Sequence, residues 1–188
     1  MGDVRLTGGL LKGRKVSVPA RRGARYTSSK VRAAIFNMIG DVEGCRVLDL
    51  FAGSGLFSIE ALSRGARRVV CVEKNRAMVD VLKENIKRLG LDKDCVVLNM
   101  DVIYALPFLS KKGDRYDLIF MDPPYDMGYV SATVDLLKGL PIFGDGSLIV
   151  AEHSKREQLT AVRQEWDVRS RLYGDTVVSL IRCEAKED

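Results

Sequence analysis

From residue 46 onward, the chain alternates between short apolar runs and amphipathic segments. The apolar runs are nearly continuous, as expected for strands buried on both faces of a parallel sheet. The segments between them have helical spacing of apolar positions and end on glycines such as Gly65 and Gly90. The pattern predicts strands at 46–51, 67–73, 95–101, 116–122 and 146–153, and helices at 54–65, 75–90, 103–110 and 129–139. Such alternation predicts a doubly wound α/β fold with a mostly parallel sheet.

Both ends of the chain depart from this alternation. Residues 166–183 contain two β-like runs around Gly174-Asp175, which predicts an antiparallel pair at the end of the sheet. Residues 4–18 contain two short β-like runs separated by glycines, and residues 27–40 have the pattern of a capped helix. We therefore expect a basic hairpin-and-helix extension over 1–40 and a main domain over 41–188.

Positive charge is concentrated in this extension. The 188 residues carry a net charge of +5, yet residues 1–32 alone carry +8, with Asp3 as their single acid. A concentrated cationic segment favours a phosphate-rich partner such as RNA, although a solvated basic surface would have the same composition. The expected phosphate contacts are Lys12, Arg14, Lys15, Arg21, Arg22, Arg25 and Arg32.

The remaining composition is that of an ordinary globular protein, with 46% hydrophobic and 29% charged residues. No apolar run approaches the length of a membrane span, and the N-terminus lacks the apolar core of a secretory signal. The four cysteines lie far apart without a C-x-x-C pair, so neither a metal site nor a disulfide framework is expected. Cys71 and Cys95 are predicted to be buried free thiols, and a reducing cytoplasm is the expected compartment.

A glycine-containing loop follows the first predicted strand of the main domain. Gly53 and Gly55 allow a tight turn and close approach to a ligand, whereas Ser58 replaces the third glycine of a dinucleotide fingerprint. Glu73 can accept hydrogen bonds from ribose hydroxyls, and Asp101 can accept one from an adenine amino group. A single strand-terminal acid would more simply cap the next turn. A ligand site is favoured because four predicted strands end near an acid, namely Asp49, Glu73, Asp101 and Asp122.

The fourth predicted strand ends in the motif Asp122-Pro123-Pro124-Tyr125. The Asp122 carboxylate and the Pro123 carbonyl can hold the two hydrogens of an exocyclic amino group and so direct its nitrogen lone pair. Prolines fix φ and carry no N–H, so the loop is stiff and presents acceptors only. Tyr125 can stack on a base that has left its helix. The simpler alternative is a proline-rich turn that ends a strand.

The carboxylate of Asp122 favours guanine over adenine as the base. Guanine presents adjacent N1–H and N2–H donors, which two carboxylate oxygens can bridge. Adenine has an acceptor at N1, so the second oxygen would be left unpaired or repelled. The preference is weak, because D-P-P-Y also occurs in adenine enzymes.

Together, the glycine loop and the strand-terminal acids resemble those of class I S-adenosylmethionine-dependent methyltransferases, and D-P-P-Y resembles the motif of amino-methyltransferases. The resemblance implies S-adenosylmethionine as cofactor and a seven-stranded sheet with an antiparallel terminal hairpin. It implies that Glu73 holds the ribose with Lys74 beside it, and that Asp101 and the Val102 backbone contact the adenine. Around the methionine portion it implies the loop residues Asp49, Phe51, Ala52, Gly53, Ser54 and Gly55.

Motifs along nearly the whole chain resemble the bacterial 16S rRNA guanine-N2 methyltransferase family. They are GGLLKGRKVSVP, RYTSSKVRAAIFNMI, VLDLFAGSGLFSIEALSRGA, DLIFMDPPYDMG and YGDTVVSLI. Tyr26 and Ser29 replace the proline and the aspartate of the family's R-P-T-S-D-R-V-R-E-A-L-F-N. The resemblance implies methylation of one guanine of small-subunit rRNA in a partly assembled subunit. We expect the protein to be a monomer. It also implies that helix 28–39 lies over the cofactor, with Thr27 and Arg32 near its methionine end.

Three other functions stay open at this point. An adenine-N6 methyltransferase acting on DNA or another RNA commonly carries a separate target-recognition domain, for which 188 residues leave no room. A nicotinamide-dependent oxidoreductase would need the third glycine and would leave residues 122–125 without a role. A non-catalytic RNA-binding assembly factor could retain the same fold, because intact site residues do not by themselves demonstrate turnover.

Overall fold

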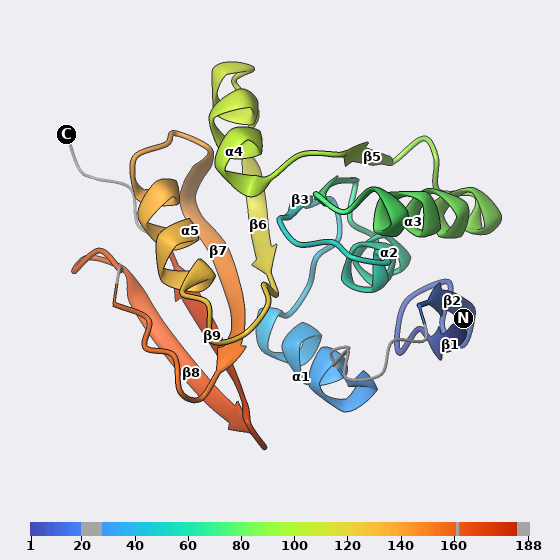
Figure 1. Ribbon diagram of the computed structural model, residues 1–188, viewed down its shortest axis with the longest axis horizontal. Coiled ribbons are helices and arrows are strands. Elements are labelled where there is room, and N and C mark those ends of the chain that lie inside the picture. Colours follow the sequence, from blue (N-terminus) through green and yellow to red (C-terminus); the bar gives the residue numbers. More distant parts are fainter. Residues whose placement is uncertain (20–27, 161, 184–188) are drawn as a thin grey trace.

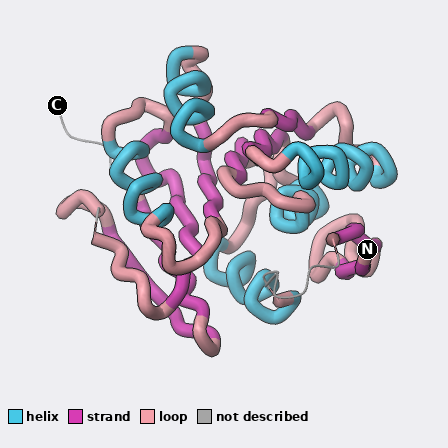
Figure 2. The backbone as a smooth tube through the Cα atoms, viewed as in Figure 1, coloured by secondary structure: helices cyan, strands magenta, loops and turns pink. Residues whose placement is uncertain are grey.

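The computed structural model describes residues 1–19, 28–160 and 162–183. A seven-stranded sheet has the order β5-β4-β3-β6-β7-β9-β8, and a separate small sheet pairs β1 with β2 (Figure 1). The strands are β1 (Gly2–Arg5), β2 (Lys15–Val18), β3 (Arg46–Asp49), β4 (Arg68–Val72), β5 (Cys95–Leu98), β6 (Tyr116–Met121), β7 (Phe143–Ser154), β8 (Asp167–Tyr173) and β9 (Thr176–Arg182). The helices are α1 (Ser29–Ile39), α2 (Leu56–Ser63), α3 (Arg76–Leu89), α4 (Val102–Lys111) and α5 (Tyr129–Lys138). Figure 2 shows the alternation of helices and strands, and the predicted doubly wound fold is confirmed.

Strand direction in the large sheet follows the prediction. Strands β3 to β7 run parallel, while β9 is antiparallel to both β7 and β8. The β8–β9 turn contains Gly174 at φ 64°, a conformation that glycine adopts without steric cost. Strand β7 begins at Phe143, three residues earlier than predicted, and its pairing with β6 shifts register between Tyr116 and Leu118. The apolar run therefore marks the middle of β7 and not its start.

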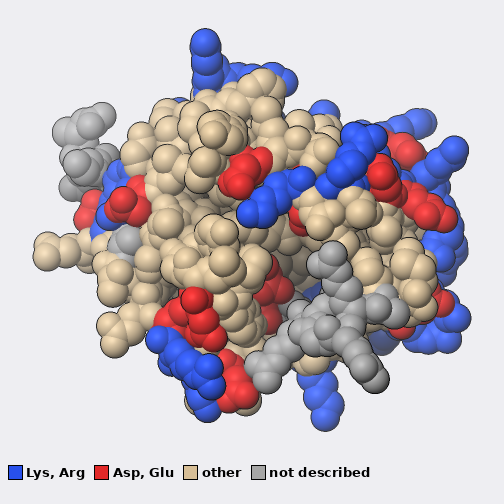
Figure 3. Space-filling model, in the orientation of Figure 1, with Lys and Arg blue, Asp and Glu red and all other residues tan. Residues whose placement is uncertain are grey.

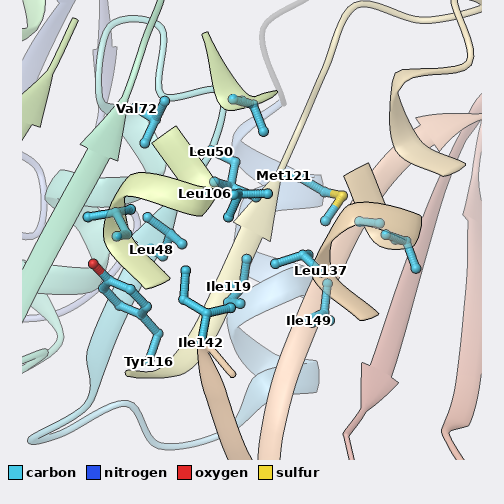
Figure 4. Packing of buried hydrophobic residues seen from close by; sticks show 14 of the residues in the cluster. Leu48, Leu50, Val72, Leu106, Tyr116, Ile119, Met121, Leu137, Ile142 and Ile149 are labelled. Atoms are coloured by element: carbon cyan, nitrogen blue, oxygen red, sulfur yellow. The ribbon is translucent and has the colours of Figure 1, made fainter. Parts of the chain in front are cut away.

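Helices cover both faces of the large sheet. On one face, α4 and α5 pack against alternate residues of the central strands, such as Leu48, Ile119 and Ile149 (Figure 4). On the other face, α1, α2 and α3 cover the intervening residues of the same strands. Here the rings of Phe36, Phe57 and Phe120 stack in sequence, with centroid separations of 4.8 and 3.7 Å. Burial on both faces explains why the strands are apolar without alternation.

The N-terminal hairpin packs on α2 and α3. Leu6 and Val16 of the hairpin share a small core with Leu56 and Ile59 of α2. The buried Asn85 side chain of α3 accepts a hydrogen bond from the backbone N–H of Ser17 and donates one to its carbonyl, each at 2.9 Å. The boundary at residue 40 stays a prediction.

Two further findings concern the sequence-based expectations. Cys71, Cys95 and Cys183 are buried free thiols, as predicted for the first two. Among the described residues, no helix has the length and apolar character needed to cross a membrane. The expectations for Arg21, Arg22, Arg25, Tyr26 and Thr27 lie outside the described residues.

Candidate functional site

A cavity of about 670 Å³ opens at the carboxyl edge of the parallel strands, where ligands of doubly wound sheets bind. It brings together residues that are far apart in the sequence but follow β3, β4, β5 and β6. The predicted residues on its wall are Asp49, Phe51, Ala52, Gly53, Ser54, Glu73, Lys74, Asp101, Val102, Asp122, Pro123, Pro124 and Tyr125. Gly55 is the one predicted cofactor residue outside this lining as the structure describes it.

Two glycines shape the loop that leads from β3 into α2. Gly53 and Gly55 have φ values of 53° and 83°, in the left-handed region that side chains disfavour. A Cβ atom at Gly55 would lie 2.1 Å from Cδ1 of Leu82 on α3, so this residue serves helix packing. The Gly53 N–H donates to Oε2 of Glu73 at 2.9 Å and thereby joins the loop to the end of β4.

Asp49 is the most unusual acid of the cavity. It is 1% exposed, and its Oδ2 accepts a hydrogen bond of 2.6 Å from the Ser58 hydroxyl. Its buried Oδ1 has no hydrogen-bond partner among the described residues. Burial raises the pKa of Asp49 to about 7, and the bond from Ser58 offsets only part of that increase. A cationic or N–H-bearing ligand in the cavity would satisfy this carboxylate.

Glu73 and Asp101 combine a structural role with an open position at the cavity. Glu73 accepts the N–H of Asn75 at 2.7 Å in addition to that of Gly53. Asp101 caps α4 by accepting the N–H of Ile103 at 3.3 Å, and Lys74 Nζ lies 3.6 Å from its other oxygen. Each carboxylate oxygen has two lone pairs, so these bonds leave acceptor capacity toward the cavity.

The D-P-P-Y loop follows β6 directly and forms one wall of the cavity. Asp122 is partly exposed, Pro123 is buried, and Pro124 is exposed. The Tyr125 hydroxyl donates to Oε1 of Glu152 at 3.0 Å and lies 3.0 Å from Oγ1 of Thr176. Burial, and then the Glu152 carboxylate, raise the pKa of Tyr125, so the hydroxyl remains a donor. The ring of Tyr125 is therefore held in one orientation beside Asp122.

Comparison with known proteins adds to this geometry. A family model described as "Conserved hypothetical protein 95" matches residues 4–182. The chain belongs to this family. Ribosomal RNA small subunit methyltransferase D of Escherichia coli (strain K12) is 34% identical over 187 residues, which cover 98% of this chain and 92% of the relative. The protein of the same name from Haemophilus influenzae is 32% identical and covers 84% and 82% of the two chains.

Solved structures show the same architecture. The Escherichia coli protein yhhF superposes with a TM-score of 0.86 at 32% identity and covers 98% of this chain and 100% of its own. The hypothetical protein TTHA0928 of Thermus thermophilus gives a TM-score of 0.82 at 33% identity, with 96% and 99% covered. These likenesses confirm the class I methyltransferase fold.

The structure contradicts the prediction that Arg32 contacts RNA. Its side chain is 1% exposed, and its Nε lies 2.5 Å from Oε2 of Glu60, which is fully buried. Burial alone would raise the pKa of Glu60, but hydrogen bonds from Thr7, Arg32 and Arg64 outweigh it and lower that pKa. Arg32 is thus occupied by an internal carboxylate and cannot present its charge to a phosphate. Arg32 also lines the cavity, and its position near the methionine end of the cofactor stays a prediction.

The other described RNA-contact residues lie on the surface. Lys12, Arg14 and Lys15 are exposed on the hairpin. Figure 3 shows Lys and Arg side chains along the edge where α3 and the hairpin lie in Figure 1, with acidic side chains among them. Contact of these residues with RNA stays a prediction.

Sequence reasoning missed Glu152, which positions Tyr125. A signal for it existed, because Glu152 lies near the carboxyl end of the fifth predicted strand, like the four acids that were identified. It also missed Glu60 and Asn85, for which the helical pattern offers no signal beyond a polar residue on a buried face.

Proposed function

We propose that this protein transfers a methyl group from S-adenosylmethionine to the exocyclic N2 atom of a guanine in small-subunit rRNA. The observation that carries the proposal is that Asp122–Tyr125 lines the same cavity as Asp49, Glu73 and Asp101. A methyl donor and a planar amino group can therefore meet in one place. Relatives named ribosomal RNA small subunit methyltransferase D, which this chain matches over nearly its full length, support rRNA as the substrate.

The cavity suits the cofactor in size and chemistry. A volume of about 670 Å³ lies within the usual range for a small-molecule site. The unpartnered Oδ1 of Asp49 suits the positively charged methionine end, and the backbone near Gly53 can approach the same portion closely. Glu73 would hold the ribose hydroxyls, and Asp101 with Val102 would hold the adenine.

The chemistry requires orientation more than acid–base strength. When bound, the cofactor supplies an electrophilic methyl group on a sulfonium sulfur. The guanine N2 lone pair would take up this methyl group while sulfur keeps the electrons of its bond to carbon, and Asp122 or water would accept the proton that N2 then loses. Before attack, that lone pair is delocalised into the ring. Asp122 and the Pro123 carbonyl would hold the amino hydrogens so that the lone pair points at the methyl group.

Tyr125 would hold the base that carries this amino group. Its hydroxyl is fixed by Glu152, so the ring is already oriented before the substrate arrives. Stacking of a base on such a ring contributes about 1–3 kcal/mol, which helps offset the cost of extruding the base. A guanine in a loop or bulge of a partly assembled subunit would be the least costly to extrude.

Replacement of Asp122 tests this arrangement. Asp122→Ala should leave cofactor affinity within about twofold but lower kcat by about 100- to 1,000-fold, the usual loss on removing one preorganised polar group. Asp122→Asn places an N–H donor beside guanine N1–H and should impair guanine methylation, whereas it would suit the N1 acceptor of adenine. Asp126→Asn, four residues away on the surface, is the matched control. Substantial activity in Asp122→Ala would refute the orienting role.

A further inference from the structure

A second cavity lies away from the methyl-transfer site, between the N-terminal hairpin and the end of α3. It encloses about 280 Å³ and is lined by Arg5, Gly13, Arg14, Lys15, Arg88 and Leu89. None of these residues lines the larger cavity. We call it the cationic recess. Four of its six residues carry a positive charge, and they come from segments more than 70 residues apart.

Two guanidinium groups of the cationic recess are held in place by backbone carbonyls. Nη1 of Arg5 donates to the Gly13 carbonyl at 2.8 Å. Nη2 of Arg88 donates to the Lys15 carbonyl at 3.0 Å and to Oδ1 of Asn85 at 2.9 Å. Because Arg88 uses only Nη2 in these bonds, its Nε and Nη1 hydrogens stay available to a ligand. The two side chains are thus preorganised, which lowers the entropic cost of binding an anion.

The charge balance of the cationic recess favours an anion. Within the described part of the chain, the one carboxylate that pairs with a lining residue is Asp3, 3.3 Å from Lys15 Nζ. The last carbonyls of α3 would repel an anion, but the Gly90 N–H caps those of Ile86 and Lys87. The Arg14 side chain forms no hydrogen bond or ion pair within the described residues, so its charge is available.

We propose that the cationic recess binds the phosphodiester backbone of the RNA substrate, with Arg88 of α3 and Arg5 of β1 as phosphate-binding residues. The inference rests on the proposed function in one respect, namely that the substrate is RNA. Arg5, Arg14, Lys15 and Arg88 are all exposed. Such an open surface with several positive charges suits an extended polyanion that lies along it, whereas a small anion is better held in an enclosed pocket.

The cationic recess is also joined to the methyl-transfer site. Asn85, which orients Arg88, donates through Nδ2 to the Ser54 carbonyl at 3.1 Å. Ser54 belongs to the wall of the larger cavity. RNA held by Arg88 and the hairpin would therefore lie at a fixed position relative to the methyl donor, which explains how sequence-independent contacts can help place one base.

Salt-dependent RNA binding by single variants tests the proposal. Filter binding would use deproteinised small-subunit rRNA from a strain lacking this protein, over a series of KCl concentrations. Arg14→Gln, Arg5→Gln and Arg88→Gln should each weaken binding about five- to tenfold at about 100 mM salt and reduce the slope of log Kd against log salt by about 0.7–0.9. Lys83→Gln is the control, since Lys83 is exposed on α3, carries the same charge and does not line the recess.

Loss of Arg5 or Arg88 could weaken RNA binding merely by displacing the hairpin, because both side chains contact its backbone. Arg14→Gln tests for this, because the Arg14 side chain does not anchor the hairpin. Wild-type affinity and slope in Arg88→Gln would overturn the proposal, and so would a loss in Arg5→Gln and Arg88→Gln that Arg14→Gln does not share. So would variants that lose binding of inorganic phosphate but keep RNA affinity. Neither result would change which nucleoside the wild-type protein methylates, so failure of this proposal can be distinguished from failure of the proposed function.

Discussion

The buried carboxylate of Asp49 makes the stability of the protein depend on pH in an unusual direction. The pKa of Asp49 is about 7 in the folded protein, against 3.8 for a solvated aspartate. Between these values the unfolded chain is ionised while the folded protein keeps the proton. Stability therefore falls as pH rises through this window, by about 1.4 kcal/mol per unit. Over the whole window the loss is about 4 kcal/mol.

Asp49→Asn removes this titration while preserving the shape of the side chain. The unfolding free energy of the variant minus that of the wild type should increase by about 2.5 kcal/mol from about pH 5 to pH 8, since the asparagine side chain carries no charge to desolvate. Urea denaturation at one-unit steps of pH across this range measures the difference, and the pH trend separates the charge effect from any change in packing. The cofactor should bind more weakly to the variant, because the acceptor for its cationic end is weakened.

Asp92→Asn is a suitable control, because Asp92 is exposed and should show little change in the stability difference across the same pH range. A constant difference between Asp49→Asn and the wild type throughout that range would refute the reasoning. A difference that shrinks with rising pH would show that Asp49 is stabilised as an anion in the folded protein.

Three more substitutions test the contacts around the site. Glu60→Leu removes the buried carboxylate that balances the charge of Arg32 and should lower the free energy of unfolding by about 3–5 kcal/mol in urea denaturation, whereas Glu60→Leu combined with Arg32→Met should lower it by less. An equal or larger loss in the double variant would contradict the ion-pair account. Asn85→Leu should speed amide exchange at residues 15–18 and raise the cofactor Kd severalfold, because it removes the hydrogen bonds from Asn85 to the Ser17 and Ser54 carbonyls. Unchanged exchange would argue against a connection through Asn85 between the hairpin and the cofactor loop. Tyr125→Ala should raise the KM for RNA by about 5- to 150-fold because the stacking of the base is lost, and Tyr125→Phe, which keeps the ring, should raise it by much less. Equal increases in KM for the two variants would exclude stacking.

The elements of the main domain follow from the sequence because each is dictated locally. Strands buried on both faces need continuous apolar residues, and helix ends need caps such as Asn75 and Gly90, so both leave a readable pattern. The carboxyl-edge acids were identifiable for the same reason, since topology places all such strand ends at one edge. The cavity lined by Asp49, Glu73, Asp101 and Asp122 is the spatial result.

Contacts between distant segments could not be predicted in this way. Arg32 looks like a surface cation in the sequence, and only the packing of α1 against α2 places it beside Glu60. Arg88 likewise has the pattern of a solvated helix residue, although it meets the hairpin backbone at Lys15. Whether a charge is paired depends on tertiary neighbours, and one sequence carries no record of them.

The identity of the methylated nucleoside tests the central claim most directly. Small-subunit particles from a strain lacking this protein would be incubated with the purified protein and isotopically labelled S-adenosylmethionine, then digested to nucleosides for mass spectrometry. The account predicts label in N2-methylguanosine at a single site, abolished by Asp122→Ala. Label in N6-methyladenosine, or no labelled nucleoside in any small-subunit particle, would contradict it.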